Sequence, residues 1–297
     1  MLMNKNIIIL FITILILLYL LKNQNETYSN MIIKPIYAIQ SVFILKENIL
    51  FLEQWIDYHK ILGFNKFYLY DNSKVQKSGT FHMKNKQFKV GNTNKYSINY
   101  GNIIKLSDYE LQQKLKLILN KYPEVEIIEW SPRDKNGIIT FNQNLAFKTA
   151  LQKMKNSNVK WCANIDMDEY IVINKGKTIH NYLNNLNPNI SSIKLRQIRF
   201  ISRFDNINKL VININKAEVK DSNAHHAYKH IYKVKDTEWI KVHTWKGKGK
   251  LIFPLHDEIG FNHYKLNTIN HSKHINNIDQ KIRNKVLQNS QNYIKIQ

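Results

Sequence analysis

Two carboxylates separated by one residue, Asp166 and Asp168, are the side chains of this sequence best placed to do chemistry. They follow the apolar run of residues 161–165, and Glu169 comes directly after them. Carboxylates two residues apart at the end of a strand can point into one crevice, and oxygen ligands of this kind suit Mg²⁺ or Mn²⁺. An Asp-x-Asp pair also arises by chance and in turn caps, so its position in the fold must decide its meaning.

The residues around this pair predict alternating strands and helices. Strands are expected at residues 37–46, 64–73, 125–130 and 159–173, and helices at about 48–63, 107–121 and 141–155. Asn48 is expected to cap the first helix and Gly63 to end it, while Ser107 begins the second helix with a capping box. Further strands at 191–201 and 229–234 and a helix near 278–288 follow. The alternation predicts an α/β domain with a mixed, mostly parallel sheet flanked by helices.

Polar side chains are found where several of these strands end. They lie at residues 46–48, 71–73, 130–133 and 166–169. Ligands of open α/β sheets bind beyond the carboxyl ends of the strands. These segments are therefore expected to line one crevice, with the Asp-x-Asp pair among them.

Two kinds of enzyme have a strand that ends in Asp-x-Asp. An aspartyl phosphatase uses the first Asp as nucleophile, but its motif lies in the first strand, with Thr or Val where this chain has Tyr170. In a sugar-nucleotide transferase, the carboxylates hold a cation that neutralises the departing nucleoside diphosphate. That enzyme needs nucleotide-binding strands before the motif, which this chain has, so the sequence favours the transferase.

Five segments of the chain resemble family-92 glycosyltransferases and their close bacterial and viral relatives, which are also similar to family-2-like transferases. They are KENILFLEQWIDYHKILGFNKFYLYDNS (46–73), WCANIDMDEYI (161–171), KHIYKVKDTEWIKVHTW (229–245), FNHYKLNT (261–268) and DQKIRNK (279–285). The second segment is similar to the family's Asp-x-Asp-Glu-Phe, and the fourth to its Asn-His-Tyr-x-x-Lys-Ser. The sequence departs from the family at Glu47-Asn48, which reverses the usual Asn-Glu, and at Asn267-Thr268, which replaces Lys-Ser.

The resemblance covers about residues 38–286 and implies a GT-A fold, a UDP-sugar donor, a divalent cation (Mn²⁺ or Mg²⁺) and an inverting transfer. Asp166 and Asp168 match the family's ligands of the metal and the diphosphate. His263 matches a histidine that completes the metal shell. Asp71 lies where such enzymes contact the base or ribose of the nucleotide.

Four further residues receive roles by their place in this pattern. Lys46, Glu47 and Arg133 lie at the ends of other strands and are expected to help bind the nucleotide-sugar. An inverting transfer needs a carboxylate that takes the proton of the acceptor hydroxyl. Asp205, after the strand at 191–201, is the first candidate for this base, and Asp257-Glu258 are the alternatives.

The charge of the chain is strongly positive. Lys+Arg total 44 against 22 Asp+Glu, which gives a formal net charge of +22. Arg occurs at only five positions, whereas Asn, Ile and Lys, whose codons are rich in A and T, are abundant. A codon bias explains much of the lysine, and specific base readout relies on Arg. We therefore expect a protein that binds an anionic sugar nucleotide and no nucleic acid.

An apolar run at residues 7–21, bracketed by Lys5 and Lys22, predicts an N-terminal membrane anchor. A helix of this length measures roughly 22 Å, and flanking lysines can reach the interfaces of a thin membrane. No small-x-small cleavage site follows, so an uncleaved anchor is favoured over a signal peptide. The expected organisation is an anchor at 1–22, a stem at 23–36 and a catalytic domain at 37–290, in a single-pass type II protein of a secretory-pathway, host or viral membrane.

The sequence as a whole predicts a membrane-anchored transferase that moves a hexose, galactose by family analogy, from a UDP-sugar to a glycan or glycoprotein. Two alternatives remain: a basic, membrane-tethered binding protein without catalysis, and an inactive transferase-like scaffold. The first alternative predicts an affinity that falls steeply with salt. The transferase predicts UDP binding that requires a divalent cation, so one titration with and without Mn²⁺ separates them.

Overall fold

The structure is a computed structural model of the chain. It describes residues 13–19, 35–75, 88–90, 93–95, 106–174, 177–201, 216–217, 228–265, 274–275 and 278–295. Two compact units are distinguished, Met1–Pro35 and Ile36–Gln297, and the second contains all the strands described.

The first unit contains the predicted anchor. Residues 13–19 are helical, and the remainder of residues 1–22 lies outside the described residues. Within the described part of the chain, no helix has the length and apolar character needed to cross a membrane. The anchor therefore stays a prediction.

The second unit begins with β1 (Ile36–Phe43), α2 (Leu45–Ile61) and β2 (Lys66–Asp71). The prediction that Asn48 caps the helix was wrong, because α2 already begins at Leu45. Asn48 lies inside the first turn, where its side-chain oxygen accepts a hydrogen bond from Ile44 N at 3.0 Å. Gly63 follows the helix as predicted, with a left-handed φ of 102° that residues other than glycine rarely adopt.

The next elements fall where the sequence predicted them. They are α4 (Asp108–Lys121), β5 (Val125–Glu129) and α5 (Gln143–Lys155). The capping box of α4 is complete, since Ser107 Oγ accepts a hydrogen bond from Glu110 N and Glu110 Oε2 accepts one from Ser107 N at 2.8 Å. Two short strands, β3 (Phe88–Val90) and β4 (Thr93–Lys95), pair with each other in the segment before α4.

The single strand predicted at 159–173 is two strands, β6 (Val159–Asn164) and β7 (Glu169–Ile173). The Asp-x-Asp pair therefore lies in the turn between two strands. Hydrogen bonds between Asp166 and Glu169 close the turn. After the turn the chain leaves β6, in the middle of the sheet, and forms β7, the last strand in the sheet order. The apolar character of both strands conceals the turn in the sequence, because each is buried.

The remainder of the unit is mainly β-structure. It comprises α6 (Ile179–Asn184), β8 (Ile190–Ile201), β9 (Lys216–Ala217), β10 (Lys229–Lys233), β11 (Thr237–Ile240), β12 (Trp245–Gly247), β13 (Lys250–Ile252), β14 (Ile259–Lys265), β15 (His274–Ile275) and α7 (Gln280–Ser290). The strands predicted at 191–201 and 229–234 and the helix near 278–288 are thus confirmed as β8, β10 and α7.

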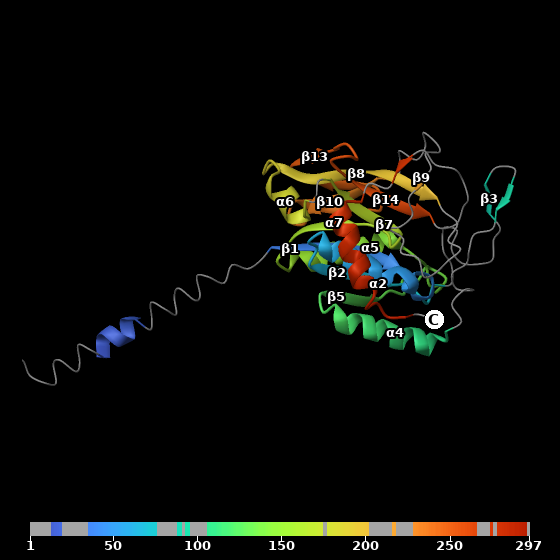
Figure 1. The fold of residues 1–297 in the computed structure, drawn as a ribbon, viewed down its shortest axis with the longest axis horizontal. Helices are drawn as coiled ribbons and strands as arrows, with labels where there is room; N and C mark the ends of the chain where they lie inside the picture. Colours follow the sequence, from blue (N-terminus) through green and yellow to red (C-terminus); the bar gives the residue numbers. More distant parts are fainter. Residues whose placement is uncertain are drawn as a thin grey trace, which may run out of the picture. The chain divides into compact units, whose positions relative to one another are not determined.

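Nine of the described strands form one mixed, mostly parallel sheet. Its order is β5-β2-β1-β6-β10-β8-β14-β7, with β13 paired to β8. The first four strands are parallel, β10 runs antiparallel to both its neighbours, and β7 is antiparallel to β14. The carboxyl ends of β1, β2, β5 and β6 consequently meet at one edge of the sheet, where the polar segments were predicted to gather (Figure 1).

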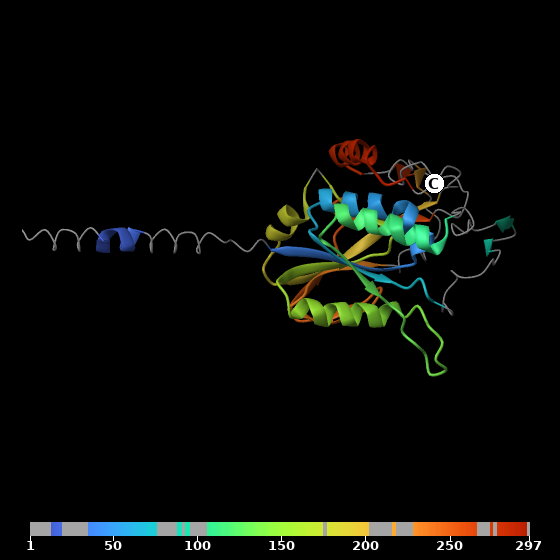
Figure 2. The same ribbon diagram turned by 90° about the horizontal axis from the view of Figure 1, so that it is seen from below.

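Helices cover both faces of this sheet, as Figure 2 shows. α2 and α4 lie on one face and α5 on the other, and α7 packs on α2. Trp55, Phe67 and Tyr170 belong to the core under α2, whereas Phe147 and Tyr232 belong to the core under α5. Because both faces are buried, the central strands are held firmly and can present their ends as a rigid support.

Candidate active site

The turn from Asp166 to Glu169 is fixed by its own hydrogen bonds and by one to β14. Glu169 N donates to Asp166 O at 3.1 Å, and Asp166 N donates to Glu169 Oε2 at 2.8 Å. Tyr264 N donates to Asp168 O at 2.8 Å, which ties the turn to β14. The Glu169 carboxylate is therefore part of the turn and closes it from inside the protein, where its side chain is 2% exposed.

Lys229, the first residue of β10, lies against this turn with its side chain 1% exposed. Its Nζ is 2.7 Å from Asp166 Oδ2 and 3.2 Å from Glu169 Oε2. Burial alone would lower the pKa of Lys229, but the Asp166 and Glu169 carboxylates outweigh burial and raise this pKa above its usual value. The ammonium is therefore charged, and it holds both carboxylates of the turn in place.

Asp166 receives a second hydrogen bond from the beginning of α5. Gln143, the first residue of α5, donates from Nε2 to Asp166 Oδ1 at 2.6 Å. Asn142 precedes it in a left-handed conformation, and its side chain caps α5 by accepting from Leu145 N. Both oxygens of Asp166 thus have protein partners, which fixes the orientation of the carboxylate.

Asp168 faces a histidine and has the more exposed carboxylate. Its Oδ2 is 3.1 Å from His263 Nε2, and its side chain is 42% exposed, against 13% for His263. His263 Nδ1 is 3.0 Å from Gln197 Oε1, a carbonyl oxygen that can only accept. In the tautomer that donates from Nδ1 to Gln197, Nε2 has a lone pair that could bind a cation shared with Asp168; without a cation, the 3.1 Å contact requires a proton on Nε2, because a carboxylate oxygen only accepts.

The two atoms that meet here fit a cation that is only partly coordinated by protein. Within the described residues, no three His, Cys, Asp or Glu side chains are grouped so as to hold an ion by themselves. Asp168 and His263 could provide two ligands. Mg²⁺ usually combines one or two carboxylates with substrate phosphates and water, so the pair suits a cation that is shared with a diphosphate.

Asp71 ends β2 at the same edge of the sheet. Its carboxylate accepts hydrogen bonds from Ser73 N at 3.0 Å and from Ser73 Oγ. Burial raises the pKa of Asp71, and these two hydrogen bonds from Ser73 counteract part of the effect. Ser73 Oγ also accepts from Leu45 N at 2.9 Å, so the segment after β2 is tied to the beginning of α2.

The neighbouring Asn72 explains the rigidity of this segment. It is fully buried, and its Nδ2 donates to Trp130 O at 2.6 Å while its backbone N donates to Phe43 O at 2.8 Å. Asn72 thereby joins the ends of β1, β2 and β5. The Asp71 carboxylate is held by a framework and not by a free loop.

The other predicted nucleotide-binding residues are spread along this edge. Lys46 is exposed and Glu47 is partly exposed in the first turn of α2, where burial raises the pKa of Glu47 to about 7. Arg133 is exposed, and its Nη1 donates to Gly137 O at 2.6 Å within its own loop. Asp205, the predicted base, lies outside the described residues, and its alternatives Asp257 and Glu258 are exposed before β14.

The comparison with protein families decides which class of enzyme has this arrangement. The model of glycosyltransferase family 92 matches residues 100–295, more than half of the chain. The chain belongs to glycosyltransferase family 92. Four of the five sequence segments lie within the matched residues, so the resemblance to the family is confirmed, while the segment at 46–73 lies before them.

Other comparisons add little. No curated protein matches this family-92 glycosyltransferase. Among solved structures, the bifunctional glycosyltransferase WbbM in its apo form has 10% sequence identity and a TM-score of 0.30. The match covers 69% of this chain and 33% of that protein, so this chain spans about a third of its length.

Three side chains of the candidate site are absent from the residues predicted for it: Lys229, Gln143 and Gln197. Lys229 stands in the segment that resembles the family's Lys-x-Ile strand, which was the one signal that could have identified it. Gln143 and Gln197 carry no such signal, because their roles depend on how α5 and β8 are placed beside the turn.

Proposed function

We propose that this family-92 glycosyltransferase has a GT-A fold and transfers a hexose, such as galactose, from a UDP-sugar with the help of Mn²⁺ or Mg²⁺. The observation that supports it is the pairing of the exposed Asp168 with His263 Nε2, beside an Asp166 whose two oxygens are already held. One carboxylate and one imidazole are thus available to a cation at the edge of the sheet where the nucleotide is expected.

The site divides the work of donor binding between its residues. Asp71, with the first turn of α2, would hold the base and ribose of UDP, and Asp168 with His263 would hold the cation. When bound, a divalent cation would neutralise the charge that develops on the diphosphate as it departs. Asp166, fixed by Lys229 and Gln143, would accept hydrogen bonds from the donor's sugar hydroxyls.

The transfer itself is a single displacement with inversion. A bond forms between the acceptor oxygen and the anomeric carbon while the bond from that carbon to the diphosphate oxygen breaks, and UDP leaves with the electron pair. A carboxylate takes the proton of the acceptor hydroxyl. Asp205 remains our candidate for this base. The alternatives Asp257 and Glu258 are disfavoured, because Glu258 lies beside Asn174, at the opposite end of β7 from the Asp166–Glu169 turn.

A titration of UDP with and without Mn²⁺ tests the proposal directly. Calorimetry on the full chain is expected to show UDP binding that depends on the cation and that EDTA abolishes. Hydrolysis of a UDP-hexose in the same buffer would then demonstrate catalysis. Metal-independent UDP binding, or binding to polyanions alone, would contradict the proposed donor chemistry.

The variant Asp168→Asn tests the site and has a natural control. It keeps the size of the side chain but weakens the proposed cation ligand, so we expect donor hydrolysis to fall at least a hundredfold, about the loss seen when one group that stabilises developing charge is removed. Asp108→Asn removes an exposed carboxylate at the beginning of α4 and should retain wild-type activity. Full activity in Asp168→Asn would refute the assignment.

We further propose that residues 7–21 anchor the enzyme in a membrane as a single-pass type II protein. The support is the apolar run itself, bracketed by Lys5 and Lys22. Replacing Leu15 by Lys puts a charge near the middle of the run, at a cost of about 3 kcal/mol for insertion. The full chain should then be extracted from membranes by alkaline carbonate, whereas Asn23→Lys, beyond the run, should remain in the pellet; equal behaviour of the two variants would contradict the anchor.

A further inference from the structure

The strand that follows the Asp-x-Asp turn has one edge without a strand partner. β7 is the last strand in the sheet order, and β14 is the one described strand that pairs with it. Backbone groups on such an edge must find other hydrogen-bond partners when they are buried. In this protein the partners are side chains of α2.

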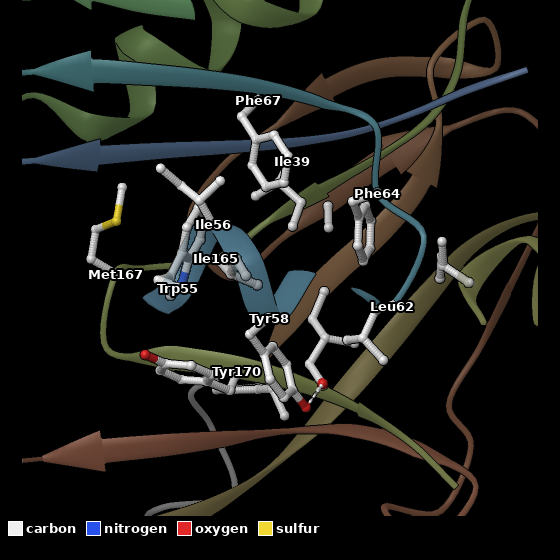
Figure 3. Packing of buried hydrophobic residues seen from close by; sticks show 14 of the residues in the cluster. Ile39, Trp55, Ile56, Tyr58, Leu62, Phe64, Phe67, Ile165, Met167 and Tyr170 are labelled. Atoms are coloured by element: carbon white, nitrogen blue, oxygen red, sulfur yellow. Dashed lines mark hydrogen bonds between the residues drawn. The ribbon is translucent and has the colours of Figure 1, made fainter. Parts of the chain in front are cut away.

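Three residues of α2 bond to the backbone of β7. Trp55 Nε1 donates to Glu169 O at 2.9 Å, and Tyr58 OH donates to Ile171 O at 2.6 Å. Ile171 N donates in turn to His59 Nε2 at 3.3 Å. Figure 3 shows Trp55 and Tyr58 extending from the helix beside Tyr170, with the hydrogen bond of Tyr58 drawn as a dashed line.

The spacing of these residues follows from the two periodicities involved. Residues 55, 58 and 59 lie on one face of a helix, because positions three and four apart are neighbours there. Residues 169 and 171 of β7 turn their backbone groups to the same side, because a strand repeats every two residues. α2 thus replaces the missing strand, and we call Trp55, Tyr58 and His59 the edge clamp.

The edge clamp requires one particular tautomer of His59. His59 Nδ1 lies 2.8 Å from Trp55 O, a carbonyl that only accepts, so this nitrogen carries the proton. Nε2 is then the acceptor that Ile171 N requires. All three clamp residues are buried, so water cannot replace them.

The edge clamp bonds to Glu169, which also forms part of the candidate site. The backbone oxygen of Glu169 is bonded to Trp55, while its carboxylate closes the turn at Asp166 N and pairs with Lys229. Asp168, the proposed cation ligand, is the preceding residue. A displacement of β7 by even part of an ångström would therefore move the side chains on which donor binding depends.

We propose that Trp55, Tyr58 and His59 are positioning residues for donor binding, which act by fixing β7 and the Asp166–Glu169 turn. They touch neither donor nor cation in this role. The inference rests on the proposed function for its kinetic consequence, while its structural part, the fixing of the turn, holds independently of which donor is used.

The substitution Tyr58→Phe removes one hydroxyl and leaves the ring in place. Its matched control is Tyr293→Phe, which removes the hydroxyl that donates to Asp57 Oδ2 at 2.7 Å on the outer side of the same helix. Tyr58→Phe loses a buried hydrogen bond and Tyr293→Phe a partly buried one, and both are expected to lower the melting temperature. Only Tyr58→Phe should accelerate hydrogen–deuterium exchange of the amides at 169–173, measured on the protein without ligands.

The kinetic readout uses the same pair of variants. We expect Tyr58→Phe to weaken Mn²⁺-dependent UDP binding roughly tenfold, because small displacements in a site are costly, and Tyr293→Phe to leave it unchanged. Equal exchange rates and equal UDP affinities in the two variants would overturn the inference. If wild-type protein fails to bind UDP, the proposed function fails, and the exchange measurement still decides whether the edge clamp fixes the turn.

A second pair of variants tests the histidine. His59→Gln offers Ile171 N an amide oxygen, whereas His59→Phe offers none. We expect His59→Gln to retain the slow exchange at Ile171 and most of the UDP affinity, and His59→Phe to lose both. Loss of neither property in His59→Phe would contradict the role of the edge clamp.

Discussion

Two identical carboxylates two residues apart have different surroundings in this site. Asp166 is held by the buried Lys229 and by Gln143, whereas the side chain of Asp168 is 42% exposed beside His263. The exposures of the two side chains are similar, 34% for Asp166 and 42% for Asp168, so the difference lies in their partners. In the proposed function, Asp166 would be a fixed acceptor and Asp168 the cation ligand.

Lys229→Met should show what the buried ammonium contributes. Without it, the buried carboxylate of Glu169 would lose its charged partner beside the partly exposed Asp166, and breaking a buried ion pair in this way costs about 3–5 kcal/mol. The free energy of unfolding in urea should fall by that amount. Lys246→Met breaks an ion pair with Glu238 in which both side chains are more than half exposed, and should cost no more than about 1 kcal/mol. Equal losses of unfolding free energy in the two variants would show that the ion pairs of Lys229 stabilise the protein no more than a solvent-exposed ion pair does.

His59 makes stability depend on pH. Burial lowers the pKa of His59 from 6.5 to about 3, although its hydrogen bond to Trp55 O works in the opposite direction. The unfolded chain takes up this proton near pH 6.5, so between pH 6.5 and 3 it binds more protons than the folded chain. The free energy of unfolding should therefore fall as the pH is lowered through this range, by up to about 1.4 kcal/mol per pH unit.

The measurement is urea unfolding at several pH values between 4 and 8. His59→Gln cannot titrate and should show a smaller slope below pH 6.5, with the slopes above pH 7 unchanged. Parallel curves for the two proteins would mean that His59 is already protonated in the fold, which would be incompatible with its acceptor role toward Ile171 N.

At the scale of elements, α2 connects two parts of the protein that are distant in the sequence. Its inner face carries the edge clamp, and its outer face carries two buried carboxylates, Glu53 and Asp57. Asp57 accepts from Asn289 Nδ2 at 2.9 Å and from Tyr293 OH, and Glu53 accepts from Ile294 N at 2.5 Å. The end of α7 and the residues after it thus bind the outer face of α2, the helix that positions the site.

Removing the residues after Ser290 should reveal this connection. Glu53 and Asp57 would each lose a hydrogen bond to a charged group, which together amounts to about 3 kcal/mol of stability. Asn289 and Lys121 would remain as partners. Urea unfolding of the full and shortened chains measures the loss.

The double variant Glu53→Gln, Asp57→Asn supplies the control. In the shortened chain, the double variant should lower the free energy of unfolding by less than it does in the full chain. The reason is that the truncation has already removed Tyr293 and Ile294, the partners of the two carboxylates. Strict additivity of truncation and substitution would show that the C-terminal segment and the two carboxylates are independent.

Local signals in the sequence predicted most of these elements. The Ser107 capping box and Gly63 mark their helix ends by chemistry that involves neighbours within four residues, and both predictions were confirmed. The prediction for Asn48 failed because Asn48 is the fourth residue of α2, where its side chain accepts a hydrogen bond from the backbone N of the N-cap residue Ile44. The strand predicted at 159–173 contained a turn that depends on the long-range partner Lys229, which no local pattern reveals.

At the scale of the whole molecule, the order of strands explains why the site could be predicted only in part. Motifs singled out Asp166, Asp168 and His263, whose roles stay predictions, and β14 brings His263 beside the turn. Lys229 reaches Asp166 because β10 lies next to β6 in the sheet, although the two are far apart in the sequence. Such neighbours follow from topology, and a single sequence does not determine them.

The net charge of +22 has a consequence for the rate of donor binding. A basic protein attracts an anionic ligand over distances that salt shortens. The association rate of UDP with Mn²⁺ should therefore decrease several-fold from low salt to about 0.15 M ionic strength, with little change in the dissociation rate. Stopped-flow measurements check this, and uncharged uridine should show no such dependence; an equal dependence for uridine would exclude steering by charge.

The residues that meet in the site come from distant parts of the sequence, so they are synthesised at different times. Asp166 and Glu169 leave the ribosome before Lys229, and His263 comes later still, since the chain is made from its N-terminus. A nascent chain that ends before residue 229 has β1, β2, β5 and β6 but neither the amine nor the imidazole that its acids face. The proposed donor binding would therefore be acquired only when the last third of the sequence has joined the sheet.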